Sequence, residues 1–320
     1  MAEPIIKVRD IAWGRIQSPD LDVQEEFLTN FGMIRAERTN DKLFMRGTGS
    51  SRHIHITEKG DPGFISLSFR AVSEDDLHKL AKEADGASEV EEIDEPGGGK
   101  RVRLTEPNGY TIEVVHGVEE VDEIPLERHT YNLGNIDKYA RGGTLWRTPR
   151  GPAHVMRIGH GVMGTPKMHE CTAWIRHHIG LIASDEVFAE DDQEKVIASF
   201  NRIDAGKDFV DHHVFLYVHN ENAGLNHISF EVPDFDDVMM GHEHLRDNGD
   251  YDHVWGIGRH VLGSQIYDYW KDPWGRVHEH WADSDTLNTD YGTRYVPVEE
   301  GLQSQWGEPA PMEFIGHVSP

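Results

Sequence analysis

The chain carries an internal repeat, because motifs from its first half return in the same order in its second half. The segment IAWGRIQSPDLDVQEEFL, which starts at Ile11, matches IGHGVMGTPKMHECTAWI, which starts at Ile158, and Gly14 falls on Gly161. Both segments predict a strand, then a turn with a proline, then a helix. Such a repeat constrains the fold strongly, since both halves must form the same elements in the same order.

Two further motifs repeat. The segment GFISLSFRAVSEDDL matches GLNHISFEVPDFDDV, with Ser68 on Ser229, and each predicts a strand followed by a helix start, since aspartates favour the first helical turn. The segment LTEPNGYTIEVVHG matches YWKDPWGRVHEHWAD, with Glu113 on Glu279, and each predicts a turn between two strands. We therefore expect an α+β fold built from two tandem modules of βαβββ type.

The repeat also divides the chain. We expect an N-terminal module at 1–117, a linker at 118–152, a C-terminal module at 153–285 and a tail at 286–320. The linker is polar and rich in glycine. The prolines and glycines of the tail predict an extended segment that wraps the surface and adds no further core element.

The charge of the chain excludes some classes of partner. It has 57 acidic and 31 basic residues, a formal net charge of −26. Binding to a nucleic-acid backbone or to an anionic membrane surface requires basic patches. We therefore expect neither nucleic acid nor membrane as a partner.

Cysteine usage and the N-terminus point to the cytoplasm. The single cysteine, Cys171, excludes an intramolecular disulfide and suits a reducing compartment. We interpret it as a small packed residue in a helix and not as a nucleophile. The N-terminus lacks the apolar segment of a signal peptide, and no apolar run reaches the length of a membrane span.

Differences between the two copies indicate where chemistry is located, because both copies share the residues that folding needs. The three matched inner positions are occupied by Trp13, Ser66 and Glu113 in the first module and by His160, His227 and Glu279 in the second. Two imidazoles and a carboxylate on three strands match the 2-His-1-carboxylate triad, which leaves open coordination positions and suits non-haem Fe(II). Because side chains alternate along a strand, His278 and His280 are expected on the face opposite Glu279.

These motifs resemble those of the type I extradiol ring-cleaving dioxygenases of the vicinal oxygen chelate superfamily. The likeness covers nearly the whole chain and is carried by GHGVM, GLNHISFEV, DPWGRVHEHW and the tail segment LQSQWGEPAPMEF. It implies two barrel-like domains with the active site in the C-terminal one. It also implies Fe(II), less often Mn(II), held by His160, His227 and Glu279. The implied activity is extradiol cleavage of a catechol with O2 in the breakdown of aromatic compounds.

The same resemblance suggests four residues around the metal. His213 or His212, which lie 14 and 15 residues before His227 (227 − 213 and 227 − 212), correspond to the acid-base histidine, and we favour His213. His260 matches the histidine of a GRH motif that hydrogen-bonds a substrate oxygen. Tyr269 matches the tyrosine beside the catecholate. One departure is that VLGSQ follows the GRH motif here, where the family often carries an aspartate.

Three alternatives remain open at this stage. A glyoxalase-type isomerase on Zn(II) or Ni(II) uses the same scaffold, typically with additional Glu or Gln ligands. A hydroxyphenylpyruvate-type dioxygenase uses the same triad but resembles the second-module segments poorly. A metal-free module that binds a small molecule would need no triad. The ring substituent is not determined by the sequence, and a homo-oligomer is the usual state for a soluble enzyme.

Overall fold

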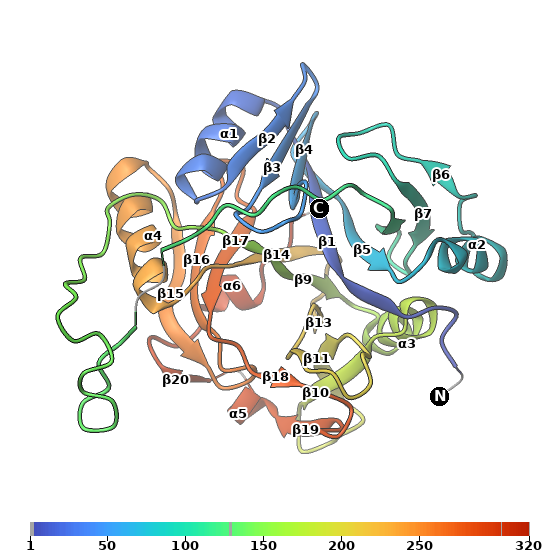
Figure 1. Ribbon diagram of the computed structural model, residues 1–320. Coiled ribbons are helices and arrows are strands. Elements are labelled where there is room, and N and C mark those ends of the chain that lie inside the picture. Colours follow the sequence, from blue (N-terminus) through green and yellow to red (C-terminus); the bar gives the residue numbers. More distant parts are fainter. Residues whose placement is uncertain (1–2, 128–129, 302, 320) are drawn as a thin grey trace.

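The computed structural model describes residues 3–127, 130–301 and 303–319, and this part of the chain forms two large sheets and one small one (Figure 1). The first half contains β1 (Val8–Ser18), α1 (Leu21–Asn30), β2 (Ile34–Arg38), β3 (Lys42–Arg46), β4 (His55–Lys59), β5 (Gly63–Ala71), α2 (Glu74–Glu83), β6 (Glu91–Glu92), β7 (Lys100–Thr105) and β8 (Thr111–His116). Its sheet has the order β2-β3-β4-β1-β5-β8-β7-β6.

The second half repeats this plan with additions. Its elements are β9 (Arg157–Thr165), α3 (Met168–Ile179), β10 (Ile182–Phe188), β11 (Val196–Arg202), β12 (Val210–Asp211), β13 (Phe215–His219), β14 (Gly224–Glu231), α4 (Phe235–Asn248), β15 (His253–His260), β16 (Ile266–Lys271), β17 (Val277–Ala282) and β18 (Thr286–Leu287). Two strands of the tail, β19 (Arg294–Pro297) and β20 (Ser304–Trp306), join its sheet. The sheet has the order β19-β10-β11-β13-β9-β14-β17-β16-β15-β20, and β12 pairs with β18 in a separate ribbon.

The prediction of tandem βαβββ modules in an α+β fold is confirmed, with one refinement. Each half is itself built from two βαβββ units, so that β1 to β4 and β5 to β8 are joined through the β1–β5 pair. The second half joins its two units through the equivalent β9–β14 pair. The sequence repeat was visible only at the level of the halves.

Side-chain caps explain why the helices begin where the aspartate motifs predict. Asp20 caps α1 and Asp234 caps α4, each accepting hydrogen bonds from backbone N–H groups of the first turn. Ser73 and Asp76 form a capping box at the start of α2. Capping of this kind satisfies donors that the helix itself leaves free.

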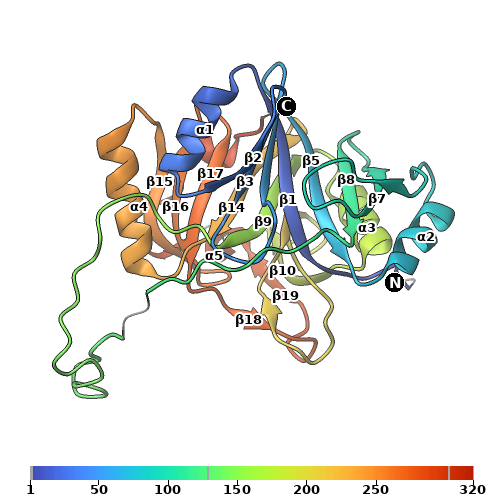
Figure 2. The same cartoon turned by 45° about the horizontal axis from the view of Figure 1, so that its top comes forward.

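The matched glycines of the repeat lie where β1 of the first half packs against β9 of the second (Figures 1 and 2). A Cβ at Gly14 would lie 2.5 Å from Ile228 Cδ1, and a Cβ at Gly161 would lie 2.4 Å from Leu67 Cδ1. Leu67 and Ile228 occupy equivalent positions in the two copies. The contact is therefore symmetric, and the buried residues of both halves form one hydrophobic cluster.

Cys171 also lies where the halves meet. Its Sγ is 3.2 Å from Asn108 Nδ2 of the first half and 3.3 Å from Thr165 Oγ1. Burial raises the pKa of the thiol to about 11. The thiol therefore stays protonated, in agreement with a packed residue.

The linker and the tail differ in structure. The described part of the linker is mostly exposed and projects beside α4 (Figures 1 and 2). The tail is largely extended but also forms β19 (Arg294–Pro297), α5 (Val298–Gly301), β20 (Ser304–Trp306) and α6 (Met312–Ile315). β19 and β20 add to opposite edges of the second sheet. The prolines and glycines gave no indication of these short strands.

We expect Gly161→Val to destabilise the protein, because its side chain would enter the volume of Leu67 at the contact between the halves. Overpacking of this kind costs about 1–3 kcal/mol of unfolding free energy. Denaturant unfolding checks the loss. In the double variant Gly161→Val/Leu67→Ala, the total loss should be smaller than the sum of the two single losses; an additive result would contradict the contact.

No helix in the described part of the chain is long and apolar enough to cross a bilayer.

Candidate metal centre and its pocket

Strand register brings the predicted ligands into one row on one face of the second sheet. His160 on β9 pairs with Ser229 on β14, Ser229 pairs with Glu279 on β17, and Glu279 pairs with Tyr269 on β16. His227 lies two residues before Ser229 and therefore points to the same face. Four side chains that are far apart in sequence thus converge.

The other two histidines of the DPWGRVHEHW segment point away from this row, as strand alternation predicted. His280 is stacked on Phe31 at 3.8 Å between ring centroids, and its Nε2 lies 2.6 Å from the carbonyl oxygen of Phe31. His278 packs edge-on against Phe27. Their face of the sheet is buried against α1 of the first half, so both are structural.

The three predicted ligands form a compact, buried group. His160 Nε2 lies 3.0 Å from Glu279 Oε2, and His227 Nε2 lies 3.4 Å from the same oxygen. One ligand atom from each residue falls within 4.8 Å of the others. The exposed fractions are 2% for His160, 5% for His227 and 0% for Glu279.

The first half holds the equivalent carboxylate in a different way. Its row of Trp13, Ser68 and Glu113 has the same register as His160, Ser229 and Glu279. Glu113 accepts hydrogen bonds from Trp13 Nε1 at 3.2 Å, Ser68 Oγ at 2.8 Å and Arg101 at 3.2 Å. The buried charge is therefore paired within the protein.

Glu279 has no comparable set of partners. Neither of its carboxylate oxygens has a hydrogen bond of normal geometry within the described residues, and His227 Nε2 is also left without one. A buried carboxylate without a partner is strongly unfavourable. Two imidazole nitrogens and one carboxylate are a donor set for a divalent transition metal, so these residues fit such an ion.

The protonation states agree with this donor set. Burial opposes charge on Glu279, but His160 and His227 hold the pKa of its carboxyl well below the usual value. Burial lowers the pKa of His160, so its imidazole is neutral. A neutral imidazole and an ionised carboxylate are the forms that bind metals.

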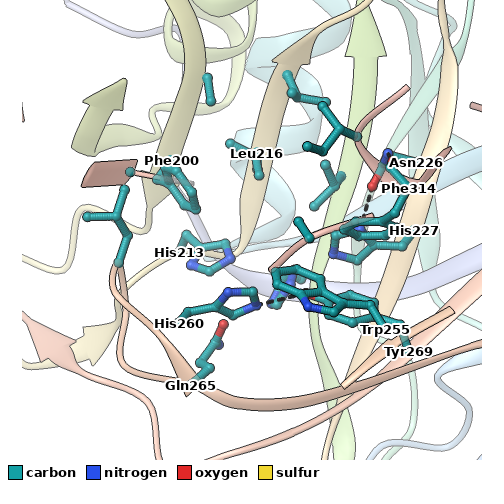
Figure 3. Close-up of a pocket in the computed structure, with 18 residues that line it drawn as sticks. Phe200, His213, Leu216, Asn226, His227, Trp255, His260, Gln265, Tyr269 and Phe314 are labelled. Carbon is teal, nitrogen blue, oxygen red and sulfur yellow. Dashed lines mark hydrogen bonds between the residues drawn. The ribbon is translucent and has the colours of Figure 1, made fainter. Parts of the chain in front are cut away.

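Asn226 orients His227 and anchors the tail over it. Asn226 Oδ1 lies 2.7 Å from His227 Nδ1, which assigns the proton to Nδ1 and leaves Nε2 with a lone pair. The amide nitrogen of Asn226 donates to the carbonyl oxygens of Phe314 and His317. Phe314 of α6 stacks on the His227 ring at 5.7 Å (Figure 3).

Of the two candidate acid-base histidines, the structure places His213 in the cavity, in the link between β12 and β13. His212 points the other way, with its Nε2 2.6 Å from Asp185 Oδ2 and its Nδ1 3.1 Å from His213 Nδ1. Arg294 Nε donates to the other oxygen of Asp185 at 2.8 Å. Asp185, His212 and His213 therefore form a buried chain that ends at the cavity.

His260 and Tyr269 also line the cavity and contact each other. His260 Nε2 lies 2.9 Å from the hydroxyl of Tyr269 (Figure 3). Burial raises the pKa of Tyr269 well above its usual value, and Glu279 adds to this. The hydroxyl therefore stays protonated and can donate a hydrogen bond.

These residues line a cavity of about 120 Å³. Figure 3 shows it with Phe200, Leu216 and His213 on one side and His227, Trp255, Tyr269 and Phe314 on the other. The remaining lining residues include His160, Asn226, His260, Leu262 and Gln265. All seven predicted site residues except His212 and Glu279 line the cavity, and Glu279 lies beneath it against His160.

Sequence reasoning missed Asp185, Asn226, Gln265 and Phe314. The repeat contained a signal for one of them, because Asn226 precedes His227 where the first copy has Ile65 before Ser66. Asp185 and Phe314 reach the site through tertiary packing, which no local motif indicates.

A second group of polar side chains lies between α4 and the sheet. Asp268 is fully buried and lies 2.8 Å from His253 Nε2 and 3.2 Å from His242 Nδ1, and it accepts from Trp270 Nε1 at 2.5 Å. Its hydrogen bond raises the pKa of His242. These bonds account for the buried carboxylate and fasten α4 to β15 and β16.

Comparison with known proteins agrees with the sequence interpretation. Over 98% of this chain, 29% of residues are identical to metapyrocatechase 2 of Cupriavidus necator, and the match covers 93% of that protein. A manganese-dependent 2,3-dihydroxybiphenyl 1,2-dioxygenase of Geobacillus genomosp. 3 is 22% identical, with 80% of this chain and 79% of the relative covered. The chain is a homologue of extradiol dioxygenases. No family model matches it.

Solved structures show the same fold. Homoprotocatechuate 2,3-dioxygenase from Brevibacterium fuscum, in complex with 3,4-dihydroxyphenylacetate, has a TM-score of 0.80 at 16% identity and covers 100% of this chain and 95% of that chain. A Mn(II)-bound glyoxalase from Novosphingobium aromaticivorans also has a TM-score of 0.80, at 21% identity, and covers 98% of this chain and 96% of that chain. The vicinal oxygen chelate fold expected from the extradiol homology is therefore confirmed, and it is a fold that an isomerase shares.

We expect His242→Gln to destabilise the protein more at pH 5.5 than at pH 8.5. The folded-state pKa of His242 is raised, so its stabilisation is complete below the unfolded pKa of about 6.5 and is lost as the pH rises through the folded pKa. The difference should be on the order of 1 kcal/mol in unfolding free energy. Denaturant unfolding at both pH values measures it.

His244→Gln is the matched control on the same helix. Burial lowers the pKa of His244. The contribution of His244 to the unfolding free energy is therefore lost as the pH falls, opposite to the pH dependence expected for His242. If the unfolding free energies of the two variants depend on pH in the same way, the hydrogen bond from Asp268 does not stabilise protonated His242.

Proposed function

We propose that this protein cleaves a catechol with O2 by extradiol ring opening, at a divalent metal held by His160, His227 and Glu279. The observation that carries the proposal is a contrast between two buried carboxylates. Glu279 has no hydrogen bond of normal geometry within the described residues, whereas Glu113 is fully paired. The relatives support the catechol assignment. We favour Fe(II), with Mn(II) as the second choice.

When bound, the metal would orient the catechol and O2 next to each other and pass charge between them. The protein residues have separate tasks. Burial lowers the pKa of His213, so its imidazole is neutral at neutral pH. Because Nδ1 of His213 bonds to His212, Nε2 remains to take a proton from the catechol and return it later.

Tyr269 and His260 would also bind the substrate. The protonated hydroxyl of Tyr269 donates a hydrogen bond to a catechol oxygen, and His260 holds that hydroxyl in place. Phe314, Trp255 and Phe200 exclude water from the reaction. Asp185 and His212 fix the tautomer of His213 and do not touch the substrate, so they are positioning residues.

A second candidate is a glyoxalase-type isomerase, favoured by the Mn(II)-bound glyoxalase that shares the fold. It would need no O2. We also infer that the chemistry lies within 153–285, with 1–117 as a metal-free module, 118–152 as a linker and 286–320 as a tail that closes the cavity.

The test is anaerobic purification with the metal quantified, followed by absorbance scans with catechols in air-saturated buffer. A yellow ring-opened product with one metal ion per chain supports extradiol cleavage. Bound metal with no ring opening of any catechol would favour the isomerase, and a lack of metal after reconstitution would overturn the ligand set.

Glu279→Gln should lower metal affinity by at least about 10-fold and abolish activity, because the charged ligand is lost. The matched variant Glu113→Gln changes the equivalent position of the first half. It should lose unfolding free energy, since Arg101 loses one of its two charged partners, but should keep its metal content. Metal analysis of both variants after dialysis checks this; equal metal loss in both would argue against the assignment.

Asp185→Asn should lower kcat by a factor on the order of 10² to 10⁴ with little change in KM or metal content. Arg294 requires an oxygen acceptor, so the amide nitrogen of the new side chain would face His212 Nε2. That donor would reverse the direction of the hydrogen bonds that run from residue 185 through His212 to His213. Arg294→Gln keeps the carboxylate and is the control. Similar losses in both variants would show that only packing is affected.

A further inference from the structure

The cavity wall has a chemical character that limits what can be attached to the catechol ring. Eighteen residues line it, among them Val162, Phe200, Leu216, Trp255, Leu262 and Phe314. None of these described residues is a lysine or an arginine. Beyond the imidazoles and Tyr269, the wall is almost entirely aliphatic and aromatic.

The cations that lie near the site in sequence are already engaged elsewhere. Arg259, next to His260 on β15, donates to the carbonyl oxygen of Ser264 at 2.6 Å and to Asp283 at 2.8 Å. Arg294 is paired with Asp185 behind His212. Neither lines the cavity, so neither is available to an anionic group on a substrate.

Two neutral amides complete the wall, and only one has a donor left. Asn226 uses its amide nitrogen for the carbonyl oxygens of Phe314 and His317. Gln265 is 1% exposed, and its Nε2 has no hydrogen-bond partner within the described residues. Its side chain lies in the cavity beside His260 and His213 (Figure 3).

We infer that the cavity selects catechols whose ring substituent is uncharged, and that the Gln265 amide is the neutral polar group that the substituent meets. The inference rests on the proposed function. A carboxylate on the substituent would lose its hydration in this wall without gaining a cation, which is strongly unfavourable. The net charge of −26 adds long-range repulsion of anions.

The inferred preference for uncharged ring substituents distinguishes the protein from one of its structural neighbours. The homoprotocatechuate dioxygenase was solved with 3,4-dihydroxyphenylacetate, which carries a carboxylate. The same fold therefore accommodates a charged substituent in that protein, whereas the walls described here offer no partner for one.

The experiment compares 4-ethylcatechol with 3,4-dihydroxyphenylacetate, which differ mainly in a methyl group replaced by a carboxylate. Anaerobic titration of the metal-loaded protein measures the Kd of each. We expect 4-ethylcatechol to bind at least about 100-fold more tightly. Equal binding, or tighter binding of the acid, would overturn the inference.

The binding measurement also separates this inference from the proposed function. If 4-ethylcatechol binds selectively but no ring opening follows in air, the activity is wrong and the selectivity stands. If both compounds bind equally and both are cleaved, the activity stands and the selectivity is wrong.

Gln265→Arg tests the residue itself. A cation at this position should reduce the preference for 4-ethylcatechol by about 10-fold or more, whereas Gln265→Leu should leave the preference against the acid in place. Gln193→Arg makes the same change at an exposed position outside the cavity. If it alters the preference as much as Gln265→Arg, net charge is responsible and the assignment of Gln265 fails.

Discussion

The structure depends on how the negative charge of a carboxylate buried in the middle of a sheet is paired. Both halves place a glutamate in the same row, and in both the side chain is almost completely removed from water. Such a charge persists only if it is paired. Glu113 is surrounded by donors from Trp13, Ser68 and Arg101, whereas Glu279 lies near imidazoles but has no hydrogen bond of normal geometry within the described residues. The first copy balances its carboxylate with hydrogen bonds, and we propose that the second balances its own with a bound metal ion.

That difference explains how one fold supports a structural half and a candidate catalytic half. The register of the central strands is the same in both, and the glycine contacts at Gly14 and Gly161 hold them together symmetrically. The first half buries the outer face of the second, where Phe31 covers His280. The inner face of the second half is thus left to the metal ligands and the tail. We propose that His160 and His227, which differ between the copies, complete a metal site around the glutamate that both copies share.

The sequence predicted those parts that depend on strand alternation and on the repeat. It indicated the α+β modules, the facing of Glu279 and the grouping of His160 and His227, because each follows from register. It did not indicate Asp185 or Phe314, since neither lies in a repeated motif and both reach the site by packing of distant segments. The two βαβββ units within each half were also missed, because their sequences have diverged too far to match.

The tail and the metal site are physically coupled through one side chain. Asn226 bonds to His227 with its oxygen and to the tail backbone with its nitrogen, so the orientation of the imidazole and the position of Phe314 depend on the same amide. The tail carries Phe314 onto the ring of His227 and also reaches β15, next to His260, through β20. Closure of the cavity and orientation of a metal ligand are therefore parts of a single arrangement, and a tail that is displaced would disturb the ligand as well as the wall.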